Sequence, residues 1–142
     1  MLEINKTYHV NCIAGMQQMD DDSVDLVVTS PPYDDLRTYN NSSKWDQNTF
    51  YAVAAQLARV IKPGGVIMWN VNDAVVNGSE TGTSFRQCLY FKDVCGLNIH
   101  DTMIYEKTGI SFASGPKSIR YSQSFEYCFV LSKGKPKTVN II

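Results

Sequence analysis

The sequence predicts a single α/β domain with a mostly parallel sheet and an antiparallel hairpin at its edge. Two helix-and-strand units follow one another in the chain, over residues 12–29 and 48–72. This alternation is typical of parallel strands joined by crossover helices. The last two apolar runs, 97–106 and 124–132, are rich in aromatic and β-branched residues and have no helical pattern between them. We therefore expect these two runs to pair as the antiparallel edge.

Composition limits the class of protein. The 142 residues suffice for one domain with its own core. Hydrophobic residues make up 44% and charged residues 19% of the chain, which is close to the average of folded soluble proteins. No run approaches the roughly 18 apolar residues of a membrane helix, and the start of the chain lacks the pattern of a signal peptide. We expect a cytoplasmic protein with no membrane partner.

Cysteine and histidine spacing argues against metal chemistry. The four cysteines are widely separated and form no CxxC pair, and the chain has only two histidines. Zinc sites and redox motifs need closely spaced ligands or thiols. We expect reduced thiols and no metal.

The first 29 residues predict the first helix-and-strand unit. A short extended run, Tyr8–Val10, precedes a helix over 12–19. An acidic turn at 20–23 then leads into a strand over 24–29. The polar stretch 34–47 that follows has no periodicity, and a loop of this length is usually functional or mobile.

The second unit has the clearest periodicity. Its apolar residues recur at helical spacing, at Phe50, Val53, Ala54, Leu57, Val60 and Ile61. Asp46 or Asn48 can cap the start of this helix, and the KPGG sequence at 62–65 ends it. The run 66–72 is apolar on both faces and predicts a central strand.

Residues 73–83 predict a loop, and 84–95 predict a moderately amphipathic helix. The glycines of the loop do not form a phosphate-binding motif, because no GK[ST] follows them and no GxGxxG occurs in the chain.

The stretch that carries chemistry is DLVVTSPPY, at residues 25–33. An apolar strand ends at Thr29 and meets Ser30, two prolines and Tyr33. The two prolines fix two φ angles and remove two backbone donors, while their carbonyls stay free to accept hydrogen bonds. A hydroxyl, bare carbonyls and an aromatic ring are thus held in one rigid corner. The alternative is a turn with a purely structural role that ends a strand.

Such a corner suits an exocyclic amine on a nucleobase. The lone pair of this amine is delocalised into the ring, so the amine is a poor nucleophile. Ser30 and the Pro31 carbonyl can accept one N–H each while Tyr33 stacks on the base, which localises the lone pair and aims it at an electrophile. In duplex DNA the base must first leave the stack.

At SPPY, residues 30–33, the sequence resembles the S-adenosylmethionine-dependent DNA methyltransferases that modify exocyclic amines. The flanks fit as well, with NCIAGM at 11–16, RVIKPGGVIMWNV at 59–71 and SFEYCFVLSKGKPK at 124–137. The resemblance covers nearly the whole chain. It implies a partial Rossmann-like methyltransferase fold, S-adenosylmethionine as the cofactor and duplex DNA as the partner.

The resemblance also assigns roles to residues. Ser30, Pro31, Pro32 and Tyr33 are the expected catalytic set. Cofactor contacts are expected from three residues near strand ends, namely Asn11, Cys12 and Thr29. A serine before the prolines resembles the members that methylate cytosine N4, whereas aspartate or asparagine is commoner in those acting on adenine N6. A hydroxyl can accept from either amine, so both bases stay open, with cytosine favoured.

The motif order resembles permuted members, which place the catalytic motif before the cofactor motif FxGxG. That glycine motif does not occur in these 142 residues. We therefore expect residues 1–142 to be the catalytic part of a larger methyltransferase domain, either as a fragment of a longer enzyme or as one half of a split protein completed by another chain. A complementing C-terminal half and a homodimer are the expected protein partners. A non-catalytic remnant that binds DNA or a partner, and an enzyme acting on RNA or on a protein amide, are the alternatives.

Charge is distributed unevenly along the chain. Residues 1–106 carry 7 basic and 13 acidic side chains, a net charge of −6, whereas residues 107–142 carry 6 basic and 1 acidic, a net charge of +5. A polyanion would prefer the C-terminal end. The expected DNA contacts are Arg37 in the loop after the corner and Lys133, Lys135 and Lys137 near the end; a solvated basic tail is the alternative.

Overall fold

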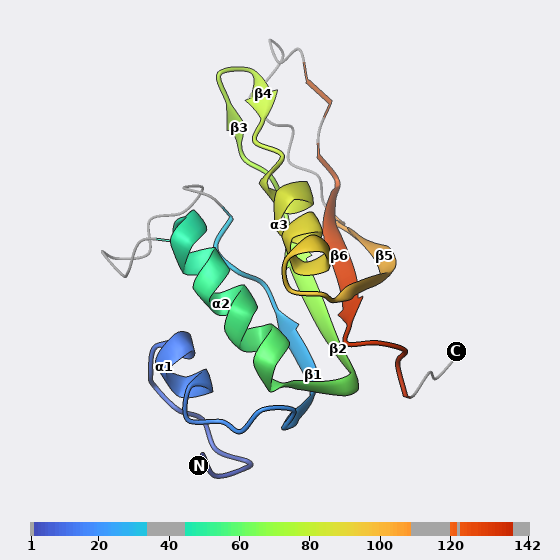
Figure 1. Cartoon of the computed structure of the whole chain (residues 1–142). Coiled ribbons are helices and arrows are strands. Elements are labelled where there is room, and N and C mark those ends of the chain that lie inside the picture. The colour runs from blue at the N-terminus through green and yellow to red at the C-terminus, as the bar shows by residue number, and fades with distance from the viewer. Residues whose placement is uncertain (1, 34–44, 109–119, 122, 138–142) are drawn as a thin grey trace.

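The computed structural model describes residues 2–33, 45–108, 120–121 and 123–137. Within them, four strands form one sheet in the order β1-β2-β6-β5, and a separate two-stranded hairpin is formed by β3 and β4. Helices α2 and α3 lie over the same face of the sheet (Figure 1). The α/β class and the antiparallel hairpin at the edge are confirmed.

The sheet is less parallel than the sequence predicted. β1 (Val24–Thr29) pairs in parallel with β2 (Ile61–Val71), but β2 pairs antiparallel with β6 (Phe125–Ser132), and β6 pairs antiparallel with β5 (Asn98–Glu106). Among the described strands, only the β1–β2 pair is parallel. The prediction rests on the helix-and-strand alternation, which gives only one parallel crossover, β1-α2-β2. It does not include the direct pairing of the β5–β6 hairpin with β2.

The two N-terminal helices begin with side-chain caps. α1 (Cys12–Met16) starts after Asn11, whose Oδ1 accepts hydrogen bonds from the backbone N–H groups of Ile13 and Ala14. α2 (Gln47–Val60) starts after Asp46, whose carboxylate accepts from the Thr49 N–H at 2.9 Å. These caps satisfy backbone donors that the helix itself cannot. α1 is shorter than the expected helix, and no strand forms over residues 8–10.

Packing between the sheet and α2 forms the core. The buried face of α2 is the one predicted from its periodicity, and it meets Trp69 of β2, which is 1% exposed. Phe50 of α2 and Phe91 of α3 (Thr83–Asp93) place their rings 6.0 and 5.1 Å from that of Trp69. β2 lies between two neighbouring strands, and its residues alternate between the core face and the opposite face of the sheet. It is therefore the central strand that the sequence predicted.

The KPGG sequence lies inside β2 and not before it. Val24 pairs with Ile61 and Leu26 pairs with Val66, so the register shifts across these residues. A Cβ atom on Gly65 would lie 3.0 Å from the backbone oxygen of Asp25, and Gly64 has φ +83°. The helix therefore ends at Val60, and the glycines let the chain bulge and continue directly as strand.

A small hairpin was missed by the sequence analysis. Residues 73–83 were expected to form a loop, but β3 (Val75–Val76) and β4 (Ser79–Glu80) pair antiparallel around Asn77 and Gly78. Both turn residues have positive φ, 50° and 79°, as two-residue hairpin turns require. The hairpin projects beyond the end of the sheet at the top of Figure 1.

Candidate active site

Three chain segments converge at one end of the sheet. Thr29 pairs with Trp69 in the parallel β1–β2 ladder, so Ser30 leaves β1 beside the carboxyl end of β2. On the other side of β2, Asn70 pairs with Cys128 and Val71 with Tyr127. Because β6 runs antiparallel, its first residues lie at this same end. The carboxyl ends of parallel strands are where open α/β sheets bind ligands.

Side chains from these segments form one hydrogen-bond network. Ser30 Oγ donates to the Tyr33 hydroxyl at 2.8 Å, and the Tyr33 hydroxyl donates to Glu126 Oε2 at 2.8 Å. Asn70 Nδ2 donates to both the Tyr33 oxygen and Glu126 Oε2, each at 2.8 Å. The thiol of Cys128 donates to Asn70 Oδ1 at 2.8 Å, which fixes the orientation of the amide. Ser30 is thus tied through Tyr33 to a carboxylate on β6.

Lys107 keeps this carboxylate ionised. Its Nζ lies 2.6 Å from Glu126 Oε1, and the Glu126 side chain is only 14% exposed. Burial raises the pKa of Glu126, but the hydrogen bonds from Lys107, Asn70 and Tyr33 outweigh this effect, so the pKa lies below its ordinary value. Burial raises the pKa of Tyr33 to about 12, with a further increase from Glu126 that opposes the lowering by Ser30. At neutral pH Tyr33 therefore keeps its proton and Glu126 does not.

The network lines a cavity of about 740 Å³, a size typical of small-molecule sites. The lining combines residues at the ends of β1, β2, β5 and β6 with one residue of the hairpin. It consists of Ser30, Pro31, Tyr33, Asn70, Asn72, Asp73, Val75, Lys107, Gln123 and Glu126. Two carboxylates and one lysine give it a net charge of −1. Chemically, the site offers several oxygen acceptors around a rigid proline corner.

Comparison with known proteins identifies the family. The family model of N6/N4 DNA methylases matches residues 24–142. The chain belongs to this family. An orphan methyltransferase, M.BamHII of Bacillus amyloliquefaciens, is 56% identical over 126 residues, which are 89% of this chain and 44% of the relative. M.BglII of Bacillus subtilis is 37% identical over 78 residues, or 51% of this chain and 21% of the relative.

Solved structures agree with this fold. The cytosine-N4-specific PvuII DNA methyltransferase matches with a TM-score of 0.77 at 19% identity, over 92% of this chain and 50% of that one. A DNA modification methylase of Thermus thermophilus, solved in complex with S-adenosylmethionine, matches with a TM-score of 0.63 at 20% identity, over 93% and 54%. The chain thus spans about half or less of the relatives it matches, and the Rossmann-like methyltransferase fold is confirmed.

The structure brings together the residues that the sequence predicted as the catalytic set. Ser30, Pro31 and Tyr33 line the cavity, and Pro32 lies between them. Ser30 is exposed and Pro31 is buried. The Tyr33 ring is half-buried and packs against the core, while its hydroxyl takes part in the network. The expected stacking of this ring on a base stays a prediction.

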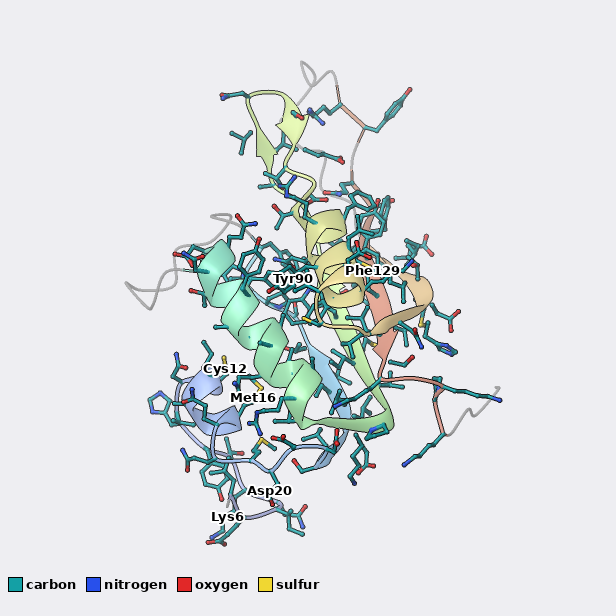
Figure 2. The ribbon with its side chains drawn as sticks, viewed as in Figure 1. Lys6, Cys12, Met16, Asp20, Tyr90 and Phe129 are labelled. Carbon is teal, nitrogen blue, oxygen red and sulfur yellow. The ribbon has the colours of Figure 1, made fainter. Side chains whose placement is uncertain are left out.

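The expected cofactor residues do not line this cavity. Thr29 immediately precedes Ser30 at the end of β1. Asn11 caps α1 and Cys12 begins it, and both side chains are exposed. In Figure 2, Cys12 lies in the lower half of the view, far from the hairpin at the top whose Val75 lines the cavity. Their cofactor role stays a prediction.

The described lysines among the expected DNA contacts are also away from the cavity. Arg37 lies outside the described residues. Lys133 follows β6 at the opposite end of the sheet, where its backbone bonds to Gly64 and Gly65. Its Nζ donates to Asp22 at 2.7 Å and to the backbone oxygen of Ala58 at 3.0 Å. Lys135 and Lys137 follow at that same end of the sheet. The expected contact of these three lysines with DNA stays a prediction.

Sequence reasoning missed four of the six residues of the network, namely Asn70, Lys107, Glu126 and Cys128. Asn70 was read only as part of a buried strand, and Glu126 as part of an edge strand. One signal was present, because a polar residue near the carboxyl end of an apolar strand, as in VIMWNVND, borders the binding edge of a parallel sheet. A second signal in the sequence is that Glu126 is the single acidic residue after position 106.

Metal-ligating side chains do not cluster in the part of the chain that the structure describes. Its histidine, cysteine and acidic residues form no group of three or more that could hold a metal ion. None of the helices found among the same residues is long and apolar enough to cross a membrane.

Proposed function

We propose that this chain is the amine-binding part of an S-adenosylmethionine-dependent methyltransferase that modifies the N4 amine of cytosine in duplex DNA. One observation carries the proposal. Ser30 Oγ uses its hydrogen to bond Tyr33 and lies at a cavity beside a rigid proline pair, so its oxygen is left to accept from an amine. Family membership supports the methyl-transfer chemistry.

In this mechanism the chain acts on the amine. Ser30 Oγ and the Pro31 carbonyl each accept one N–H, which withdraws the lone pair from the ring and directs it outward. As the nitrogen gains a bond to the methyl carbon and the bond from that carbon to sulfur breaks, the positive charge on the nitrogen grows, and both hydrogen bonds strengthen in the transition state. The methylated nitrogen then becomes neutral by releasing one of its two protons to solvent. The target base reaches the cavity only after rotation out of the duplex.

S-adenosylmethionine supplies an electrophilic methyl group when it is bound. The net negative lining, with Asp73 and Glu126, suits the positive charge of a sulfonium. The Thermus thermophilus neighbour was solved in complex with this cofactor, which supports the assignment. Thr29 adjoins Ser30 and is the proposed cofactor contact nearest the amine site, with Asn11 and Cys12 as further contacts.

We also propose that residues 1–142 act with a complementing segment. β1 forms one edge of the described sheet, and its Leu26 and Val28 are 60% and 67% exposed. A parallel strand is normally buried on both faces and paired on both sides. The relatives are about twice as long as the matched region or longer. A strand added to β1, from a C-terminal half or a second copy, would cover this edge.

Cytosine is the proposed base, with adenine N6 as the second candidate. The name of the PvuII neighbour specifies cytosine N4, and it has a TM-score of 0.77. The serine before the prolines agrees with that choice. Ser30 can accept from either amine, so base identity is a separate question for experiment. A DNA substrate also fits the cytoplasmic location expected from the sequence.

The test is methyl transfer in vitro. The protein is incubated with methyl-labelled S-adenosylmethionine and either duplex DNA or RNA. The 142-residue chain is tested first by itself and then joined to the additional segment that its longer relatives contain. We expect label in DNA from one of these two forms. Label only in RNA or in protein would refute the DNA substrate, and no label from either form would favour a non-catalytic remnant.

A further inference from the structure

We propose that Glu126 determines which chemical group the site accepts from a nucleobase. By fixing the direction of the hydrogen bonds through Tyr33, it makes Ser30 an acceptor only, so the site selects an amino group and rejects a carbonyl. This inference rests on the proposed function, since it concerns the same cavity, but it can be tested without methyl transfer.

The first step is the state of Glu126. An ionised carboxylate can only accept hydrogen bonds. Its Oε1 receives Lys107 at 2.6 Å, and its Oε2 receives both Asn70 and Tyr33 at 2.8 Å. A mostly buried carboxylate with three donors around it stays charged. It therefore requires each of these neighbours to point a hydrogen toward it.

The second step concerns Tyr33. A phenol has a single hydrogen, and Glu126 takes it. The phenol oxygen can then only accept, and it accepts from Asn70 and from Ser30, both at 2.8 Å. The opposite arrangement, in which Tyr33 donates to Ser30, would leave the carboxylate facing an oxygen lone pair. Glu126 thus excludes it.

The third step concerns Ser30. Its one hydrogen is directed to Tyr33, so the side of its oxygen that faces the cavity carries lone pairs alone. An N–H of an exocyclic amine matches this oxygen. A carbonyl at the same ring position, as in uracil, would place oxygen against oxygen with no hydrogen between them. A site built to receive a donor rejects a ligand that lacks one.

The variant Glu126→Gln removes this constraint at nearly the same side-chain size. A neutral amide can donate to the Tyr33 oxygen, which lets Tyr33 turn its hydrogen to Ser30 and Ser30 turn its own toward the cavity. The variant Tyr33→Phe keeps the ring and releases the Ser30 hydrogen by a different route. Glu106→Gln removes the same charge at an exposed residue outside the cavity lining and serves as the matched control.

The experiment compares binding of single-stranded oligo(dC) and oligo(dU) of equal length at pH 8. Bases in a single strand need no extrusion from a duplex, so no recognition sequence is required. We expect wild type and Glu106→Gln to bind oligo(dC) about tenfold or more tightly than oligo(dU). A difference of this size corresponds to the loss of one hydrogen bond that leaves an oxygen unpaired. In Glu126→Gln and Tyr33→Phe, the ratio of the two dissociation constants should fall by about tenfold.

The outcomes separate this inference from the proposed function. An unchanged ratio in folded Glu126→Gln protein overturns the inference even if the wild type methylates DNA. A wild type that transfers no methyl group, either alone or joined to the completing segment, but whose base preference is lost in Glu126→Gln, supports the inference and refutes the function. Should Glu126→Gln unfold, Tyr33→Phe decides by the same ratio, and an unchanged value overturns the inference.

Discussion

Tyr33 and Glu126 lie 93 residues apart in the chain, and their side chains are joined by a hydrogen bond of 2.8 Å. This contact connects the proline corner after β1 to the start of β6 across the intervening strand β2, whose Asn70 donates to both partners. The corner is therefore not an isolated turn at the end of a strand. Its hydroxyl groups are oriented by a carboxylate on another part of the sheet.

Replacing Ser30 with alanine should slow methyl transfer by about 100-fold, because one preorganised hydrogen bond to the reacting group is lost. Ser30 is exposed, so the free energy of unfolding should change little. The measurement is the single-turnover rate at saturating cofactor. Ser79→Ala, on the exposed tip of the β3–β4 hairpin, is the control. Equal rates for Ser30→Ala and wild type would show that the corner is only structural.

The Tyr33 phenol should ionise near pH 12, about two pH units above the ordinary value of 10.0. Burial disfavours the phenolate, and the Glu126 charge adds to this effect. Subtracting the ultraviolet titration curve of Tyr33→Phe from that of wild type isolates this group. Tyr121→Phe removes a fully exposed tyrosine and provides the reference curve. A Tyr33 midpoint near 10 would contradict the buried network.

Glu126 should contribute to stability at neutral pH and lose that contribution in acid. Its pKa is lower in the folded protein than the ordinary 4.5, so below pH 4.5 the unfolded chain binds this proton first and stability falls with decreasing pH. Urea unfolding from pH 6 to pH 3 measures the effect. The difference in unfolding free energy between wild type and Glu126→Gln should shrink as the pH falls. A difference that stays constant or grows would mean that the carboxylate is not held in its charged form.

Asp73 should matter for folding more than its position in the cavity suggests. It is 4% exposed, and its carboxylate accepts from the Ser84 N–H at 2.9 Å and from the Ser84 hydroxyl at 2.5 Å at the start of α3. Asp73→Ala leaves these donors unsatisfied and should cost about 2 kcal/mol of unfolding free energy. Asp101→Ala, at an exposed residue of β5, should change it by less than about 0.5 kcal/mol. Similar losses for both variants would argue against this role.

Local patterns predicted the elements that have their own periodicity or caps. α2 and β2 follow from apolar spacing and from Asp46, and β1 follows from an apolar run that stops at Thr29. The β3–β4 hairpin has strands of two residues, too short for periodicity, although the turn pair Asn77 and Gly78 was a usable signal. KPGG was read as a stop because its glycines break helices, whereas here they allow a bulge.

Only the part of the candidate site that follows β1 could be predicted from the sequence. SPPY carries its chemistry in four consecutive residues, so the sequence shows it directly. Asn70 and Glu126 join it only because β2 lies between β1 and β6, with β6 antiparallel and in a register that pairs Asn70 with Cys128. Strand order and register depend on the packing of the whole sheet, which no local pattern reveals.

The most direct test of the central claim is the identity of the methylated nucleoside. DNA treated with the active form of the enzyme and S-adenosylmethionine is digested to nucleosides and analysed by mass spectrometry, with Ser30→Ala protein treated in parallel. We expect N4-methylcytosine from wild type and about 100-fold less from Ser30→Ala. A methyl group on a ring carbon, or equal amounts of N4-methylcytosine from both proteins, would contradict the proposed role of the corner.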